Sequence, residues 1–173
     1  MMSSSKALSV LRFVAEGFRA GVRTEDAPEI ERLVHMTGVF SQAEIGIARE
    51  LVEEVLAKGE ATSGYYFLFA DGPSGIEGYT CYGPISGTKV RYELYWIAVK
   101  PGTQRGGLGR RLQDATEECV RALGGVYLIA ETSTTPSYAA ARGFYLSLGY
   151  KLLAEVPDWH DDGDGLAIFG KRL

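Results

Sequence analysis

The segment Gln104-Arg105-Gly106-Gly107-Leu108-Gly109-Arg110 decides the fold of this chain. An apolar, aromatic run over residues 94–99 precedes it, and a helical pattern over 111–120 follows it. A strand, a glycine-rich turn and a helix start, in this order, make an anion-binding arrangement. Glycine lets another group approach the backbone closely, and the first helical amides have no partner within the helix. The segment therefore predicts a site for a phosphate or a pyrophosphate.

The composition predicts one domain with its own hydrophobic core. The chain has 173 residues, and 46% of them are hydrophobic, so neither a metal nor a disulfide staple is needed. A net charge of −4 argues against a nucleic-acid partner, which normally selects a basic face. Cys81 and Cys119 are too few for a disulfide framework or a zinc site.

The N-terminal residues give no sign of membrane insertion or export. No apolar run approaches the length of a bilayer span, so we expect no membrane partner. The apolar part of residues 1–17 is short, contains Arg12 and lacks a clear cleavage site for a signal peptide. We therefore expect a cytoplasmic protein.

Helix-start signals and hydrophobic periodicity divide the N-terminal half. Residues 18–22 fit a short strand, and a helix is expected next, with Asp26 as N-cap and Glu29 three residues later. Ser41 and Glu44 form a second capping box before another helix. Aromatic and β-branched runs separated by turn residues then predict an antiparallel meander, over 65–70, 76–82 and 89–99.

The C-terminal half begins with the glycine-loop helix, which ends at Gly124-Gly125. Its predicted inward residues are Leu112, Ala115, Cys119, Val120 and Leu123. A strand over 126–131, a helix over 138–148 and a hairpin of 150–156 with 166–171 complete the chain. The order β-α-α-β-β-β-α-β-α-β-β predicts an α/β (α+β) fold, with a mixed, mostly antiparallel central sheet flanked by helices.

The glycine loop shares features with two kinds of nucleotide-binding loop. A triphosphate loop requires a lysine and a hydroxyl residue directly after its last glycine, and Gly109 is followed by Arg110 and Arg111. A dinucleotide fingerprint finds two of its three glycines, with Leu112 at the third position. The first glycine of that fingerprint should also follow the strand almost directly, whereas seven residues intervene here. A dinucleotide therefore fits only in part.

The pattern Q-x-x-G-x-G at Gln104, Gly107 and Gly109 resembles the acetyl-CoA pyrophosphate loop of the GNAT superfamily of N-acyltransferases. Residues 141–150, A-R-G-F-Y-L-S-L-G-Y, are similar to the late helix of that family. The resemblance covers residues 18–173 and leaves 1–17 as an N-terminal extension. It implies a GNAT-like fold and an acetyl-CoA-dependent transfer of an acetyl group directly to a primary amine. We expect the acceptor to be a small molecule.

The resemblance also implies where acetyl-CoA binds. The loop strand and the strand after its helix should splay apart, so that the pantetheine arm can bond backbone groups of the loop strand. We place those groups at Ile97, Ala98 and Val99. The residues expected to hold the pyrophosphate are Gln104, Arg105, Gly106, Gly107, Leu108, Gly109 and Arg110. One departure concerns the segment before the late helix, where many family members have a small polar residue, often Asn, and this chain has T-T-P-S-Y over residues 134–138.

Acetyl transfer needs a base for the amine, hydrogen-bond donors for the carbonyl oxyanion and a proton for the leaving thiolate. The resemblance implies Tyr145 as the proton donor, although a purely structural role as a core aromatic is the alternative. Glu93 and Glu131 are the candidate bases, acting directly or through water, and both could equally be solvated or paired carboxylates. Backbone amides of the loop strand could stabilise the oxyanion.

Three further features bear on function. The run 158–164 fails as an EF-hand loop, because Phe169 stands at the closing position, and is expected to be a solvated turn. The alternative is that Trp159, His160 and the nearby aspartates attract a cationic acceptor. A homodimer through the sheet edge or the terminal hairpin is compatible with the family resemblance. The functional rivals are a non-catalytic acyl-CoA-binding module and an NAD(P)-dependent oxidoreductase.

Overall fold

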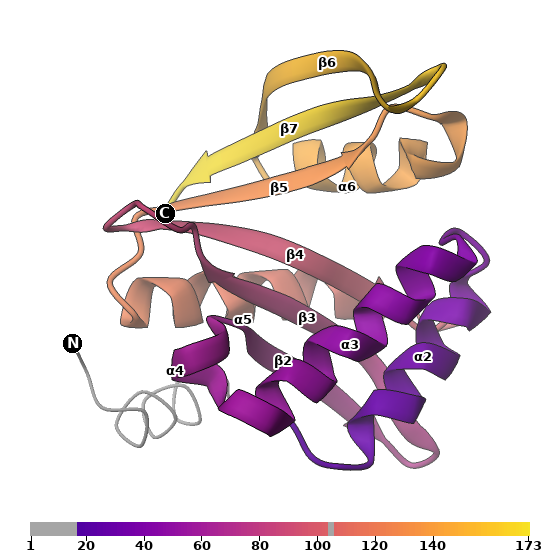
Figure 1. Ribbon diagram of the computed structural model, residues 1–173, viewed down its shortest axis with the longest axis vertical. Coiled ribbons are helices and arrows are strands. Elements are labelled where there is room, and N and C mark those ends of the chain that lie inside the picture. The colour runs from indigo at the N-terminus through magenta and orange to yellow at the C-terminus, as the bar shows by residue number, and fades with distance from the viewer. Residues whose placement is uncertain (1–16, 104–105) are drawn as a thin grey trace.

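The computed structural model describes residues 17–103 and 106–173. Its seven-stranded sheet has the strand order β1-β2-β3-β4-β5-β7-β6 (Figure 1). The strands are β1 (Arg19–Ala20), β2 (Tyr66–Gly72), β3 (Gly75–Pro84), β4 (Arg91–Val99), β5 (Tyr127–Ser133), β6 (Lys151–Asp161) and β7 (Asp164–Arg172). The helices are α2 (Asp26–Thr37), α3 (Gln42–Lys58), α4 (Glu60–Ser63), α5 (Leu108–Ala122) and α6 (Ala139–Ser147), with a 3-10 turn, η2 (Pro136–Tyr138), before α6.

The sheet is mixed and mostly antiparallel, as the sequence predicts. Strands β2, β3 and β4 form the expected meander, and β6 and β7 form the expected terminal hairpin. The β4–β5 pair is the parallel pair, and α5 provides the crossover that parallel strands require. The glycine turn therefore leads from β4 into α5, and α5 returns the chain across one face of the sheet to β5.

Two hydrophobic cores lie on opposite faces of the sheet. Helices α2 and α3 cover one face, where Ile30, Val52 and Phe69 belong to the core. Helices α5 and α6 pack on the other face, against Leu94 and Leu128 among others. The periodic apolar positions account for both cores, because they place the apolar stripe of each helix against the sheet.

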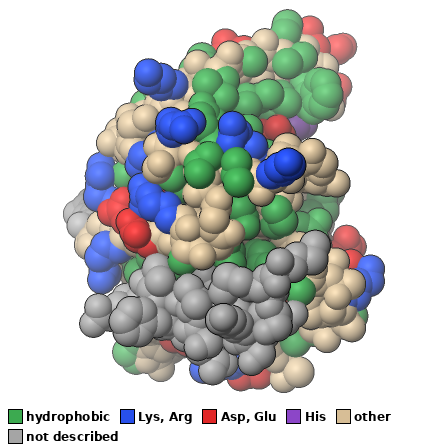
Figure 2. Space-filling model, turned by 90° about the vertical axis from the view of Figure 1, so that its left-hand side faces the viewer, with side chains coloured by type: hydrophobic (Ala, Val, Ile, Leu, Met, Phe, Trp, Pro, Cys, Tyr) green, Lys and Arg blue, Asp and Glu red, His purple; other side chains and the backbone are tan. Residues whose placement is uncertain are grey.

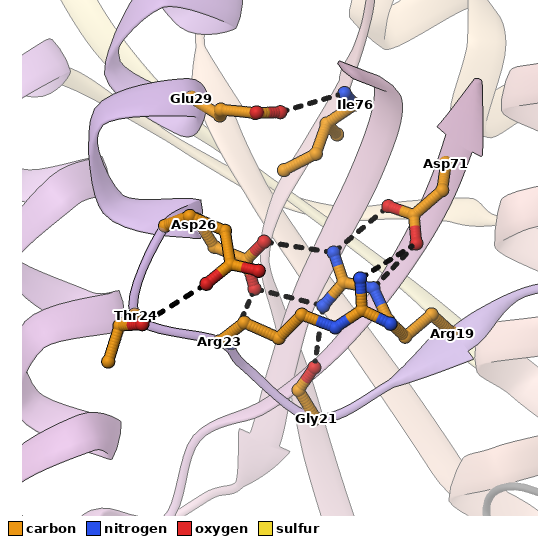
Figure 3. A network of polar contacts seen from close by, with 9 residues as sticks. Arg19, Gly21, Arg23, Thr24, Asp26, Glu29, Asp71 and Ile76 are labelled. Atoms are coloured by element: carbon orange, nitrogen blue, oxygen red, sulfur yellow. Dashed lines mark hydrogen bonds and ion pairs between the residues drawn. The ribbon is translucent and has the colours of Figure 1, made fainter. Parts of the chain in front are cut away.

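The start of α2 corrects one prediction from the sequence. Asp26 is the first helical residue and is not the N-cap; Glu25 holds that position without a capping side chain. The Asp26 carboxylate instead accepts two hydrogen bonds of 2.9 Å from the Arg19 guanidinium and one of 2.6 Å from the Arg23 amide. Arg19 also pairs with Asp71 of β2 (Figure 3). This network fixes the short strand β1 against α2 and β2.

The capping box of α3 is confirmed. The Ser41 hydroxyl accepts from the Glu44 amide, and the Glu44 carboxylate accepts from the Ser41 amide at 2.7 Å.

The short helix α4, between Gly59 and Gly64, was not predicted, since four residues are too few to show a period. Within the described residues, no helix combines the length and the apolar content needed to cross a membrane.

Candidate functional site

The central feature of the site is the divergence of β4 from β5. The two strands pair from Arg91 with Tyr127 to Leu94 with Ala130, and in the described chain β5 then continues with β7 alone. Figure 1 shows β4 and β5 separating beyond this point. The backbone of β4 from Tyr95 to Val99 is thus open on the β5 side, while Trp96 to Val99 pair with β3 on the other side. The splay expected from the resemblance is present.

The open part of β4 contains a register shift. Cys81 of β3 is opposite Trp96, and Tyr82 is opposite Leu94, so Tyr95 is an extra residue in β4. Such a bulge increases the local twist and bends the strand. Ile97 and Val99 pack against the α5–α6 core, whereas Ala98 is buried in the α2–α3 core. The predicted pantetheine contacts, Ile97, Ala98 and Val99, therefore all lie on the open segment.

Beside this opening, the N-terminus of α5 supplies amides that make no backbone hydrogen bond to the described residues. Gly107 is the N-cap and has φ 67°, a left-handed conformation that favours glycine. Arg111 is the first residue whose amide bonds back along the helix, to the Gly107 carbonyl at 3.1 Å. The amides of Leu108, Gly109 and Arg110 precede that bond, so they are the orphan donors expected at a helix start. Together with the helix dipole they favour a bound anion.

Gly109 brings the two sequence motifs together. A methyl group at this position would contact the Phe144 ring at 3.6 Å and Val99 Cγ2 at 3.7 Å. The glycine loop, the end of β4 and the late helix α6 therefore meet at one point. Arg110 is exposed, and its guanidinium donates to the Ser147 carbonyl at the end of α6, at 3.2 Å. Gly106 is exposed, and Gln104 and Arg105 lie outside the described residues.

Tyr145 is held by aromatic rings. It is 5% exposed, and its ring centroid lies 5.8 Å from Phe144, 5.7 Å from Tyr150 and 5.6 Å from Phe169. Its hydroxyl makes no hydrogen bond to the described residues. Burial raises the pKa of Tyr145 above the ordinary value for tyrosine, so the phenol stays protonated near neutral pH. A buried, protonated phenol can act as a proton donor.

Glu93 and Glu131 flank the point where the strands separate. Glu93 precedes the last β4–β5 pair and Glu131 follows it. Since Leu94 and Ala130 of that pair face the α5–α6 core, alternation places both carboxylates on the opposite face. Burial, and then the charge of Glu131, raise the pKa of Glu93 to about 7. Glu131 is exposed. The structure thus brings the two candidate bases together on the side of the sheet that α2 and α3 cover.

An aromatic contact that the sequence did not predict bridges the two diverging strands. The Phe40 ring lies 4.8 Å from Trp96 of β4 and 6.1 Å from Tyr138, which follows β5. The Tyr138 hydroxyl donates to Glu44 Oε1 at 2.8 Å. The contact between Tyr138 and Glu44 joins residues 94 positions apart, so no local pattern could reveal it. Phe40, Trp96 and the neighbouring Tyr95 all pack against the α2–α3 core, on the face of the sheet to which Glu93 is assigned.

The acidic run 158–164 is largely solvated, as predicted, but the turn itself is only Asp162-Gly163, because β6 extends to Asp161 and β7 begins at Asp164. Trp159 is 62% exposed and His160 is also exposed. The Asp158 carboxylate accepts from the Gly163 amide at 2.7 Å, which stabilises the turn. Asp164 differs from its neighbours because it accepts a 2.5 Å hydrogen bond from Ser133 at the end of β5. The Asp164 side chain thus contacts β5, the strand that contains Glu131.

Comparison with known proteins identifies a family of enzymes that is similar to this chain. The family model described as "Acetyltransferase (GNAT) domain" matches residues 62–152. A solved structure assigned to the GNAT family of acetyltransferases, from Desulfovibrio desulfuricans, is 41% identical to this chain, with a TM-score of 0.86. That match covers 90% of this chain and 97% of the other. No curated protein matches the sequence.

More distant structures share the fold. An aminoglycoside 6'-N-acetyltransferase in complex with coenzyme A is 18% identical, with a TM-score of 0.70 over 90% of this chain and 96% of the other. The ribosomal-protein-S18-alanine N-acetyltransferase of Escherichia coli is 20% identical, with a TM-score of 0.63 over 90% and 93%. The first of these modifies a small molecule and the second a protein, so the shared fold does not select an acceptor.

Proposed function

Because the chain belongs to the GNAT family of acetyltransferases, we propose that it transfers an acetyl group from acetyl-CoA directly to a primary amine of a small molecule. The observation that carries the proposal is the open edge of β4 next to the first amides of α5, which the helix itself does not pair. An extended amide-containing arm can add to the strand edge while its phosphates meet the helix N-terminus. The coenzyme A complex of the aminoglycoside enzyme supports a CoA-type ligand for this fold.

The residues at the splay can perform the proton transfers of this reaction. Bound acetyl-CoA would supply a thioester carbonyl, to which the amine nitrogen adds while the carbon–sulfur bond breaks. Glu93 or Glu131 would first take a proton from the ammonium group of the acceptor, directly or through water, because only the neutral amine has the lone pair that attacks. Open β4 amides would donate to the carbonyl oxygen, and the Tyr145 hydroxyl would protonate the departing thiolate. Charge and atoms balance, because the ammonium nitrogen loses two protons as it becomes the amide. One goes to the base and then to water, and the other replaces, through water, the proton that Tyr145 gives to the sulfur.

The surroundings of the two glutamates support a small cationic amine as the acceptor. Glu44 and Asp164 both lie near Tyr138, because after burial the Glu44 hydrogen bond and the charges of these two carboxylates raise the pKa of Tyr138. Carboxylates attract an ammonium group, and the rings of Phe40 and Trp96 offer faces for cation–π contacts.

A thermal-shift series tests the cofactor. Acetyl-CoA at a hundredfold excess over its dissociation constant should stabilise the protein by about 2.7 kcal/mol and raise Tm. CoA, NADH and NADPH serve as comparison ligands. A rise with NADH or NADPH alone would overturn the proposal and favour an oxidoreductase. A rise with acetyl-CoA but no thiol release across a broad amine screen would favour a non-catalytic acyl-CoA-binding module.

Glu93 predicts the pH dependence of the reaction. A base must be deprotonated, so kcat/KM for the amine should fall as pH drops below about 7. In Glu93→Gln this limb should be lost together with most of the activity, whereas the exposed Glu155→Gln should behave like the wild type. If Glu93→Gln keeps both its rate and its acid limb, the base is another group and Glu131→Gln is the next variant.

Stability gives a second readout for Glu93. Its folded pKa lies above the ordinary value of 4.5, so between pH 4.5 and about 7 the folded protein binds more protons than the unfolded chain. Stability from this group therefore falls as pH rises through that window. The difference corresponds to ~3 kcal/mol, which partial exposure to water reduces to about 1–2 kcal/mol. Glu93→Gln should accordingly be more stable than the wild type at pH 8 and nearly equal to it at pH 4.

The β6 edge supports a homodimer as a second proposal. Leu152 and Leu153 are 47% and 49% exposed, and β6 is the last strand of the sheet. Figure 2 shows hydrophobic side chains gathered over the upper part of the molecule, at the height of β6 and β7 in Figure 1. An unpaired edge with apolar side chains favours association. A monomer mass from sedimentation equilibrium would refute the homodimer.

The cytoplasmic location stays a prediction, which cell fractionation can check.

A further inference from the structure

A buried carboxylate in α5 has no part in the chemistry described above. Glu117 is 3% exposed and lies between the helix and the sheet. Its oxygens accept hydrogen bonds of 2.7 and 2.9 Å from Lys171 Nζ of β7, and Arg121 Nη2 is 3.8 Å away. A buried ion pair usually contributes little net stability, because desolvation of both charges offsets their attraction. A role in fixing geometry is therefore the stronger explanation.

The ion pair continues into a chain of hydrogen bonds that ends on Tyr150. The Tyr150 hydroxyl accepts from Gln113 Nε2 at 2.6 Å and donates to Glu117 Oε1 at 3.2 Å. Lys171 Nζ also lies 5.5 Å from the centroid of the Tyr150 ring. Tyr150 is 2% exposed, and Gln113 is fully buried. We name Gln113, Glu117, Tyr150 and Lys171 the α5–β7 network.

Through Tyr150, this network contacts Tyr145, the proposed proton donor. The Tyr150 ring packs on Tyr145 with centroids 5.7 Å apart, and the Tyr150 amide donates to the Tyr145 carbonyl at 3.1 Å. Two further rings, Phe144 and Phe169, hold Tyr145 by packing alone. Of these three aromatic residues, Tyr150 is the one whose side chain is hydrogen-bonded to α5.

We propose that the α5–β7 network positions the Tyr145 hydroxyl relative to the amides at the start of α5, so that Gln113, Glu117, Tyr150 and Lys171 are positioning residues of the site. The inference rests on the proposed function. Leu108 and Glu117 belong to the same helix. A rigid helix therefore connects the proposed phosphate site to the ring that supports the proton donor. A change in either end of the network would shift Tyr145 without touching the cofactor site.

A double-mutant cycle tests this role by kinetics. Tyr150→Phe keeps the ring and removes both hydrogen bonds, and Glu117→Gln removes the charge. Each should lower kcat about tenfold with KM for acetyl-CoA unchanged, as a small misplacement of a reacting group does. Neither should lower kcat further in the Tyr145→Phe background. Glu118→Gln, on the exposed side of α5, is the matched control and should keep wild-type kcat.

A spectroscopic readout separates this inference from the proposed function. The chain has 10 tyrosines, so protein labelled with 3-fluorotyrosine gives a ¹⁹F spectrum in which Tyr145→Phe identifies the Tyr145 signal. Glu117→Gln should shift that signal, and Glu118→Gln should not. An unmoved signal, or equal losses of kcat with and without Tyr145, would overturn the positioning role. Absence of any acetyl transfer by the wild type would instead refute the proposed function, while the ¹⁹F comparison would still decide the positioning role.

Discussion

Tyr145→Phe is expected to lower kcat about 100-fold, because a positioned proton donor typically contributes at least this factor. The substitution removes one oxygen and leaves the ring between Phe144, Tyr150 and Phe169. KM for acetyl-CoA and Tm should therefore change little. The measurement is steady-state thiol release with a saturating amine. If protonation of the CoA sulfur is not part of the rate-limiting step for the chosen amine, steady-state kcat does not report the effect. Pre-steady-state acetyl transfer is therefore measured in parallel.

The matched control for this variant is Tyr127→Phe. Tyr127 begins β5, at the end of the strand opposite to Glu131, and its ring packs against Arg91. Its hydroxyl should be irrelevant to transfer. Wild-type kcat in both variants would rule out Tyr145 as the proton donor and leave it a packing residue, the alternative that its burial also allows.

Gly83→Ala is expected to lower the free energy of unfolding by about 3 kcal/mol, at the upper end of the cost of overpacking. Gly83 of β3 is opposite Glu93 of β4. A methyl group there would overlap the carbonyl oxygen of Gly64 and lie 3.2 Å from the Tyr95 ring. The obstacle is backbone, which cannot rotate away as a side chain can. Urea denaturation measures the change.

Gly46→Ala provides the opposite sign as a control. Gly46 lies within α3, and a methyl group there would have nothing within 4 Å. Alanine in a helix interior should add about 0.5–1 kcal/mol of stability. If Gly83→Ala were as stable as the wild type, the chain after α4 would have to cross β3 by another path.

Local signals predicted most of the elements. The capping box of Ser41 and Glu44 sets the start of α3, because both partners of the box lie within four residues. Asp26 shows where such reasoning fails. The motif D-A-P-E suggested an N-cap, but Arg19 from β1 binds that carboxylate and the helix begins at Asp26 itself. A partner in another element overrides a local preference.

The candidate site was likewise predictable only where its residues are close together in the sequence. The glycine loop and late helix could be found from the sequence because each motif is contiguous, and Gly109 shows that they meet. On α5 the predicted inward residues Leu112, Cys119 and Val120 are buried. Gln113 and Glu117 are buried as well, although polar residues four apart on a helix resemble a solvated face. Their partners, Tyr150 just before β6 and Lys171 in β7, lie far along the chain, so no periodic pattern could place Gln113 and Glu117 inside.

The one-sided pairing of β4 beyond Leu94 has a consequence for amide hydrogen exchange. In a central strand every amide is normally bonded to a neighbour, so all of them exchange slowly. Between Tyr95 and Val99, alternate amides point at β3 and at the opening. Slow and fast exchange should therefore alternate along one strand in the free protein. A ligand that adds to the open edge would slow the fast set alone, which locates it to single residues without a substrate or a turnover assay.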